Sequence, residues 1–174
     1  MPTTESVATQ ANDQGNDLGV ISAWATSNDV RNSPHFDSDT ADIVLTFGDL
    51  DAPNGATING LEITVEGQGN NFAATPLIFL NNGTDNSDSL APSAAFNKSD
   101  QTVTYGGSTT TWGIEWDHTR ANEVVATIDV STIASGRLFW DHLFMTVYYT
   151  EVISGSPLKL TSGLIQLTLG KITI

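Results

Sequence analysis

The chain has 174 residues, no cysteine and a formal net charge of −14, because only six Lys and Arg stand against 20 Asp and Glu. This length suits one domain with a full core, and the lack of cysteine excludes disulfides and thiolate metal sites. The acidity argues against binding to nucleic acid through a basic surface and against binding to anionic membranes.

The first 19 residues are polar and rich in Gln, Asn, Asp and Gly. This composition predicts an extended N-terminal arm, residues 1–19, that becomes ordered when it lies against another surface. The terminus lacks the basic and apolar regions of a signal peptide, so none is expected. No apolar stretch approaches the roughly 20 residues that a membrane-spanning helix needs.

Strand signals recur at short intervals between residues 20 and 151. Apolar residues alternate with polar ones, as at Ile43, Leu45 and Phe47, and turn residues separate the segments. Residues 77–80 are a continuous apolar run, which favours a strand buried on both faces. The expected strands cover residues 43–47, 57–66, 77–80, 101–105, 111–116, 123–130 and 137–150.

No amphipathic helix of about ten residues is visible in this pattern. Residues 20–151 therefore predict an all-β domain, an antiparallel β-sandwich of the jelly-roll-like kind. We expect Trp112, Trp140 and Val147 in its core. The four Trp could instead form a platform for stacking sugars, but aromatic residues are ordinary core residues of sandwiches, and we expect at least two of them to be buried.

Two of the three histidines lie in a repeated Trp-Asp-His triplet, at residues 116–118 and 140–142. Two Asp and two His could hold a metal ion if these segments were neighbours. Strand alternation instead sends the Asp and the His of one triplet to opposite faces, which favours a structural role for His118 and His142. His35 has no second histidine at the spacing of a helical zinc site.

Two acidic loops, residues 37–42 and 85–88, could offer oxygen ligands to Ca²⁺, but neither has the spacing of an EF-hand. Solvated turn carboxylates are the favoured interpretation. No nucleophile elbow, Walker motif or dinucleotide fingerprint occurs in the chain. We therefore expect no cofactor, no bound metal and no catalytic residue.

The end of the chain repeats with a period of seven, so that Leu158, Ile165 and Ile172 occupy equivalent positions. Units this small cannot bury an apolar strip alone, so they must pack on their own domain or on other copies. We predict that residues 152–174 are a β-repeat tail that holds a homo-oligomer together, a trimer. The expected interface consists of the large aliphatic residues of the tail: Leu158, Leu160, Leu164, Ile165, Leu167, Leu169, Ile172 and Ile174.

Several segments occur in an order typical of one family. They are Ala23-Trp24 before a polar loop and the strand that ends at Phe47, residues 56–65, Tyr105-Gly106-Gly107 leading to Trp112-Gly113, and residues 141–150. Together they resemble a β-sandwich domain common in virion proteins of tailed bacteriophages, over about residues 20–150. The resemblance implies a structural or attachment role without catalytic residues. We also expect Gly60 and Gly113 to lie where backbones approach closely or φ is positive.

These observations lead us to expect a non-enzymatic virion protein, a capsid decoration (cement) protein on the capsid surface. Its expected partners are further copies of itself and the major capsid protein or another virion protein, with a basic patch facing the acidic chain. The alternative is a tail-fibre or baseplate adhesin that binds host glycans, which a strip of exposed Trp or Tyr would favour. A third class, a carbohydrate-active enzyme, would need a cleft with two facing carboxylates. Fold analogy alone does not choose among them.

Overall fold

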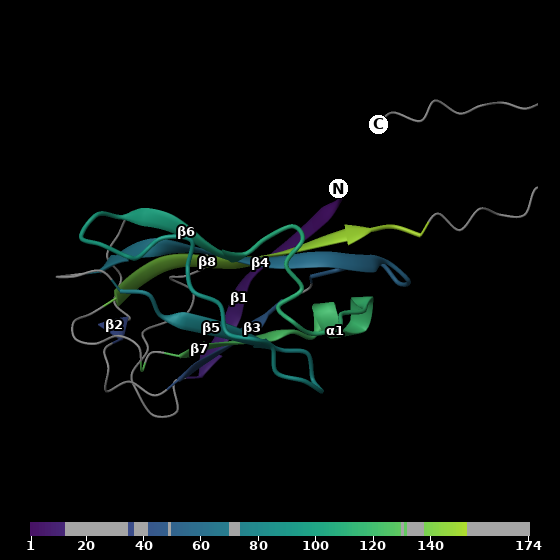
Figure 1. Ribbon diagram of the computed structural model, residues 1–174, viewed down its shortest axis with the longest axis horizontal. Helices are drawn as coiled ribbons and strands as arrows, with labels where there is room; N and C mark the ends of the chain where they lie inside the picture. The colour runs from purple at the N-terminus through teal and green to yellow at the C-terminus, as the bar shows by residue number, and fades with distance from the viewer. Residues whose placement is uncertain are drawn as a thin grey trace, which may run out of the picture.

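The strands of this chain build two antiparallel sheets that pack face to face as a β-sandwich (Figure 1). The computed structural model describes residues 1–12, 35–36, 42–48, 50–69, 74–129, 131 and 138–152. No helix within these ranges is long and apolar enough to cross a membrane. The prediction of an antiparallel β-sandwich is confirmed.

One sheet, called here the four-stranded sheet, has the order β1-β8-β4-β6, and the three-stranded sheet has the order β3-β7-β5. The first consists of β1 (Thr3–Asn12), β8 (Leu138–Thr150), β4 (Thr57–Gly69) and β6 (Gln101–Gly106), and the short β2 (His35–Phe36) also pairs with β8. The second consists of β3 (Ile43–Phe47), β7 (Val125–Asp129) and β5 (Leu77–Asn81). The helix α1 (His118–Asn122) precedes β7, and the Asp117 carboxylate caps it by accepting from the Arg120 backbone N at 2.8 Å.

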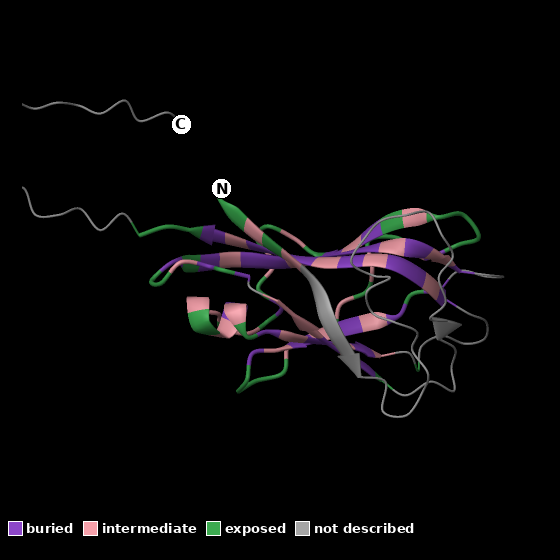
Figure 2. Cartoon of the chain, turned by 180° about the vertical axis from the view of Figure 1, so that it is seen from behind, coloured by how far each residue is buried: buried purple, intermediate pink, exposed green. Residues whose placement is uncertain are grey.

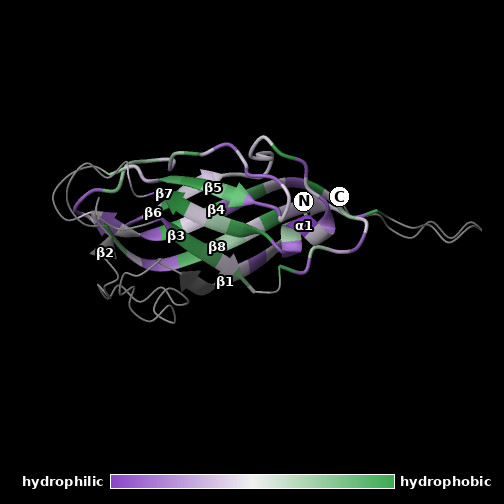
Figure 3. Ribbon diagram, turned by 90° about the horizontal axis from the view of Figure 1, so that it is seen from below, coloured by the Kyte–Doolittle hydropathy of each residue, from purple (hydrophilic) through white to green (hydrophobic). Residues whose placement is uncertain are grey.

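Buried residues alternate with more exposed ones along the strands (Figure 2), and hydrophobic residues alternate with hydrophilic ones (Figure 3). The buried apolar residues form the core between the sheets. In β4, Leu61, Ile63 and Val65 are fully buried, whereas Glu62 between the first two and Glu66 after the third are partly exposed. The hydrophobic effect is the main force that holds the two sheets together, because each buried aliphatic side chain contributes about 1.5–3 kcal/mol.

The core contains the large residues that the sequence placed there. Trp112 is 2% exposed, and Trp140 and Val147 are fully buried, which confirms that prediction. The ring of Phe96 packs against Trp140, with a centroid distance of 5.6 Å. Both sheets and the long loop before β6 therefore contribute to one core.

The strand β5 is buried on one face only. Ile78 and Leu80 are fully buried, but Leu77 and Phe79 are partly exposed. The prediction that residues 77–80 are buried on both faces is therefore wrong. The reason is that β5 belongs to an antiparallel sheet with a single face toward the core.

The strand β1 joins the two sheets, as Figure 1 shows. Its first half pairs with β8, beginning with Thr3 opposite Tyr148, and its second half pairs with β3, ending with Asn12 opposite Val44. The prediction of an arm is therefore wrong for residues 3–12, because these residues form a strand of the sandwich. The mostly small or polar residues of this segment give little apolar signal, whereas the strand is held by two backbone ladders. Residues 13–19 lie outside the described residues.

Residues 82–100 connect the two sheets on the opposite side. Ile78 of β5 and Leu90 of the loop exchange backbone hydrogen bonds of 3.0 and 2.8 Å. The backbone N of Ser93 donates to the carbonyl oxygen of Thr104 in β6 at 2.7 Å, and the backbone N of Thr104 donates to Ser93 Oγ at 3.0 Å. These bonds occupy the outer edges of β5 and β6, where free ladder groups would invite pairing with other chains.

The segment after β6 folds across β4 and does not form the strand predicted over residues 111–116. Trp112 has a φ of 58°, in the left-handed region, which an extended strand does not allow. Its indole Nε1 donates to the carbonyl oxygen of Leu61 at 2.9 Å, and the Leu61 backbone N donates to the carbonyl oxygen of Thr110 at 3.0 Å. We call this arrangement of residues 106–113 over β4 the Trp112 clamp.

Two glycines permit the clamp to close. A Cβ at Gly60 would collide with the carbonyl oxygen of Gly107, so only glycine allows the two backbones to approach. Gly113 has a φ of +76°, which L side chains rarely adopt. The expectations for Gly60 and Gly113 are confirmed.

Candidate functional site

The outer face of the four-stranded sheet carries an aromatic row between carboxylates. His142, Phe144 and Tyr148 of β8 are partly exposed and alternate with buried Leu143, Met145 and Val147. We call these three side chains the aromatic row. The carboxylates on the neighbouring strands are Glu5 of β1 and Glu62 and Glu66 of β4.

The strand register places two of these carboxylates on either side of β8. Glu5 and Glu62 both lie opposite Thr146, one across the β1–β8 ladder and the other across the β4–β8 ladder. Thr146 is 4% exposed although the alternation of β8 turns it away from the core. Glu5 and Glu62 therefore flank the aromatic row in its middle.

Both carboxylates influence the pKa of the Tyr148 hydroxyl. Its hydroxyl donates to Glu62 Oε1 at 3.4 Å. Burial raises the pKa of Tyr148, and the negative charge of Glu62, the hydrogen bond to it and the charge of Glu5 raise it further. This part of the face therefore has a negative potential.

A β-bulge changes the direction of side chains at Asp141. Glu66 pairs with His142 and the next residue, Gly67, pairs with Trp140, so Asp141 is the extra residue. Trp140 and Leu143 both point into the core, which leaves Asp141 and His142 together on the outer side. The expectation that strand alternation separates this Asp from its His is therefore wrong for the second triplet. A Cβ at Gly67 would collide with the carbonyl oxygen of Phe139, so glycine permits this bulge.

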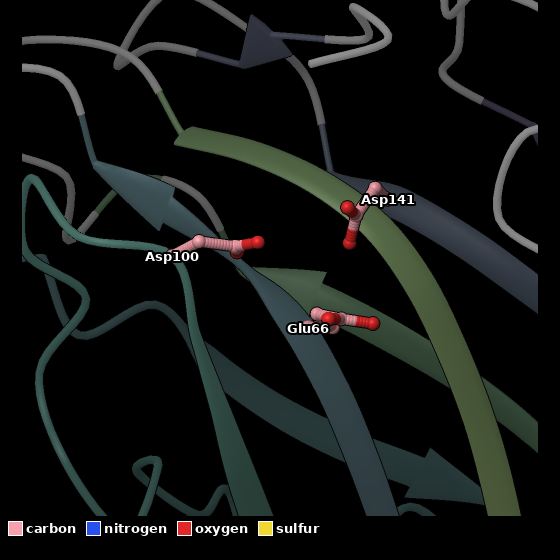
Figure 4. Close-up of side chains that lie close together, drawn as sticks. All are labelled: Glu66, Asp100 and Asp141. Carbon is pink, nitrogen blue, oxygen red and sulfur yellow. The ribbon is translucent and has the colours of Figure 1, made fainter. Parts of the chain in front are cut away.

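The bulge brings three acidic side chains together at one end of the face (Figure 4). Carboxylate oxygens of Glu66, Asp100 and Asp141 all lie within 4.8 Å of one another. Glu66 comes from β4, Asp141 from β8, and Asp100 from the loop that enters β6. Such oxygens are the ligands that Ca²⁺ or Mg²⁺ prefers, and a cation would relieve the repulsion among three carboxylates. The sequence did not indicate this cluster, because its members are far apart in the chain.

A hollow of about 360 Å³ lies beside the aromatic row, and the described residues that line it are Glu5, Ser6, His142 and Phe144. The rings of His142 and Phe144 lie 5.1 Å apart at 38°. The register explains the hollow, because β1 pairs with β8 only as far as Phe144 and β2 begins to pair at Phe139. Between these ladders β8 has no partner on that side among the described strands.

The first Trp-Asp-His triplet lies at the start of α1. Asp117 is its N-cap and lies 3.7 Å from the Arg120 guanidinium, and His118 contacts Thr119. Asp117 and His118 do not join Asp141 and His142 in any group of three or more metal-ligating side chains found among the described residues. The described residues therefore give no support to a metal site shared by the two triplets. His35 lies in β2.

The acidic loop at residues 85–88 is organised by asparagine. Asn82 is 3% exposed, and its Oδ1 accepts from the backbone N of Thr84 at 3.0 Å and of Asp85 at 2.8 Å. Its Nδ2 donates to the carbonyl oxygen of Glu115 at 3.1 Å. Asparagine is used here to hold turns, which explains the composition of the loop without a ligand. Of the loop at residues 37–42, only Asp42 is described.

The three tryptophans that the structure describes do not form a platform for sugars. Trp112 and Trp140 are core residues, as predicted, and Trp116 packs against the core with its Nε1 donating to the carbonyl oxygen of Thr111 at 2.8 Å. Trp24 lies outside the described residues. The predicted assembly interface also lies outside them: Leu158, Leu160, Leu164, Ile165, Leu167, Leu169, Ile172 and Ile174.

Comparisons of the chain with protein-family models, with curated proteins and with solved structures found no match.

Proposed function

We propose that this chain is a non-enzymatic structural protein of a bacteriophage virion, a capsid decoration protein that stabilises the head shell. The observation that carries the proposal is that segments resembling the phage virion domain contact one another. Residues 56–65 lie in and before β4, which pairs with β6 on one side and with β8 on the other. Trp112 bonds to the same strand through Leu61. Segments far apart in sequence thus form one structural unit, which supports reading their order as a fold signature.

The strand order supports the jelly-roll-like part of the proposal. In sequence order, β1, β4, β6 and β8 fall in one sheet and β3, β5 and β7 in the other, so most connections pass between sheets. Jelly rolls of this kind occur in viral capsid proteins and in lectins. Leu90, which bridges to Ile78 at the outer edge of β5, occupies the place of a further strand in the three-stranded sheet.

The proposal includes assembly through the C-terminal repeat. Residues 152–174 form a β-repeat tail that links three copies. The assembled protein sits on the capsid surface and contacts the major capsid protein. The supporting observation is the seven-residue apolar repeat, which needs stacked neighbours.

The direct test is the location and effect of the protein on particles. Heads stripped of this protein should burst earlier on heating than complete heads, and purified protein should restore their resistance. Labelling in intact virions should place the protein on heads. Labelling found only on tails would reject the decoration role.

An adhesin that binds host glycans is the second candidate, and the aromatic row favours it. Phe144 and Tyr148 offer partly exposed rings on which a sugar could stack, although Trp112 and Trp140 are buried in the core. Binding of the purified chain to host-surface glycans, lost on replacing Tyr148 by Ala, would support this candidate.

A further inference from the structure

The outer face of the four-stranded sheet combines negative charge with partly exposed rings. We propose that this face is the docking surface for an arginine- or lysine-rich segment of a protein partner. The identity of that partner as a shell protein rests on the proposed function, whereas the chemistry of recognition rests on the face itself.

The spacing of the groups suits a cationic side chain. Glu5 and Glu62 lie across β8 from each other, on strands that flank it, so their backbones are roughly 10 Å apart. Phe144 and Tyr148 stand two residues to either side of Thr146 along β8. A cation held over either ring therefore has a carboxylate within reach on both sides, and aromatic faces attract cations.

The hollow beside the aromatic row offers a place for one such side chain. The described residues that line it are Glu5, Ser6, His142 and Phe144, so it combines an acidic residue with two aromatic ones. A guanidinium can stack on a ring with its face while its edge donates hydrogen bonds to a carboxylate. Arginine fits this combination better than lysine, because an ammonium group is compact and strongly hydrated.

The charges of the described residues favour a basic partner over a neutral one. The described cations Lys98 and Arg120 belong to a loop and to α1, not to a strand of this face. The net charge of −14 adds long-range attraction for a basic surface. A neutral glycan could stack on the rings, but it carries no positive charge for these carboxylates to attract.

The test measures binding of a fluorescent oligo-arginine peptide to the full-length protein by anisotropy at low salt. The face variant carries Glu5→Gln, Glu62→Gln and Glu66→Gln. The matched control carries Asp85→Asn, Glu115→Gln and Glu123→Gln, which removes the same charge from exposed positions elsewhere. We expect binding to weaken about tenfold or more in the face variant and by no more than about twofold in the control. A third variant, Phe144→Leu, should weaken binding by a few fold while the domain stays folded.

Equal weakening in the two triple variants, or no weakening in the face variant, would overturn the inference. Binding of a neutral oligosaccharide that Phe144→Leu abolishes and the Glu→Gln changes do not affect would assign the face to glycans and would also overturn it. The same proteins are then added to stripped heads. If all variants bind heads equally, the inference is overturned and the proposed function stands. If no variant binds heads but peptide binding stays specific to the face, the proposed function fails and the inference stands.

Discussion

The indole of Trp112 donates a hydrogen bond to the carbonyl oxygen of Leu61, 2.9 Å away and 51 positions earlier in the chain. The same carbonyl oxygen accepts from the backbone N of Gly107 at 3.1 Å. One acceptor in β4 thus anchors both ends of the segment that follows β6. Trp112 and Gly107, on which the proposed relationship to phage virion domains partly depends, are residues that hold the fold.

Closing the gap at Gly60 should destabilise the domain. Gly60→Ala places a methyl group against the carbonyl oxygen of Gly107, and we expect a loss of about 1–3 kcal/mol in the free energy of unfolding. Urea titration measures the loss. Ser108→Ala, an exposed change in the same segment, should stay within about 0.5 kcal/mol of the unchanged protein. Equal stability of the two variants would show that the clamp does not close as described.

Removing an aromatic side chain from the core should lower the free energy of unfolding more than Gly60→Ala does. Trp140→Ala deletes a fully buried indole that packs on Phe96, and we expect a loss of about 3–5 kcal/mol. Trp116→Ala, at a partly exposed position, should cost less. Thermal unfolding followed by circular dichroism compares them, and an unchanged Tm for Trp140→Ala would mean that β8 is wrongly assigned.

Deleting residues 1–12 should lower the Tm of the domain or prevent its folding. The reason is that β1 pairs with both β8 and β3, so its loss exposes an edge of each sheet. Differential scanning calorimetry makes the comparison. If the shortened chain unfolded at the same temperature as the full chain, residues 1–12 would be an arm after all.

Deleting residues 157–174 should change the oligomeric state of the protein and leave the sandwich folded. We expect the mass in solution to fall from that of a trimer to that of a monomer, because the repeat is the proposed assembly segment. Light scattering coupled to gel filtration measures the mass. The sandwich itself should still form, which far-ultraviolet circular dichroism would show. An unchanged mass would argue against this role for the tail.

Alkaline pH should destabilise the domain partly through Tyr148. In the unfolded chain its hydroxyl ionises near the ordinary pKa of 10, whereas in the folded protein burial and the charges of Glu62 and Glu5 raise that pKa. The stabilisation is therefore fully present below pH 10 and is lost as the pH rises through the raised value. Tyr148→Phe should make the loss of stability above that pH less steep. Glu62→Gln should let the phenolate form at lower pH, as ultraviolet absorbance would record. A titration unaffected by Glu62→Gln would mean that the two groups do not interact.

The alternating segments of β3, β4 and β8 could be predicted from the sequence, because each strand has one face toward the core. β1 could not be predicted, because Thr3, Thr4 and Ser6 contribute backbone pairing and little apolar area. Alternation at Trp112 and Trp116 predicts a strand over residues 111–116, but the structure has none there, and the positive φ of Trp112 does not allow an extended strand.

The candidate site was harder to predict than the fold. Asp141 meets Glu66 and Asp100 because a bulge reverses the alternation of β8, and a bulge has no clear sequence signal apart from Gly67 opposite it. The flanking of Thr146 by Glu5 and Glu62 depends on the register of two ladders. Neither relationship follows from spacing along the chain.

The most direct measurement is the bursting temperature of phage heads stripped of this protein and then reconstituted with it. A protein that binds only the assembled shell stabilises it by mass action, by about 2.7 kcal/mol at a hundred times its Kd. Reconstituted heads should therefore survive to the temperature of complete heads, and stripped heads should burst earlier. Stripped heads that are as resistant as complete heads would contradict the decoration role.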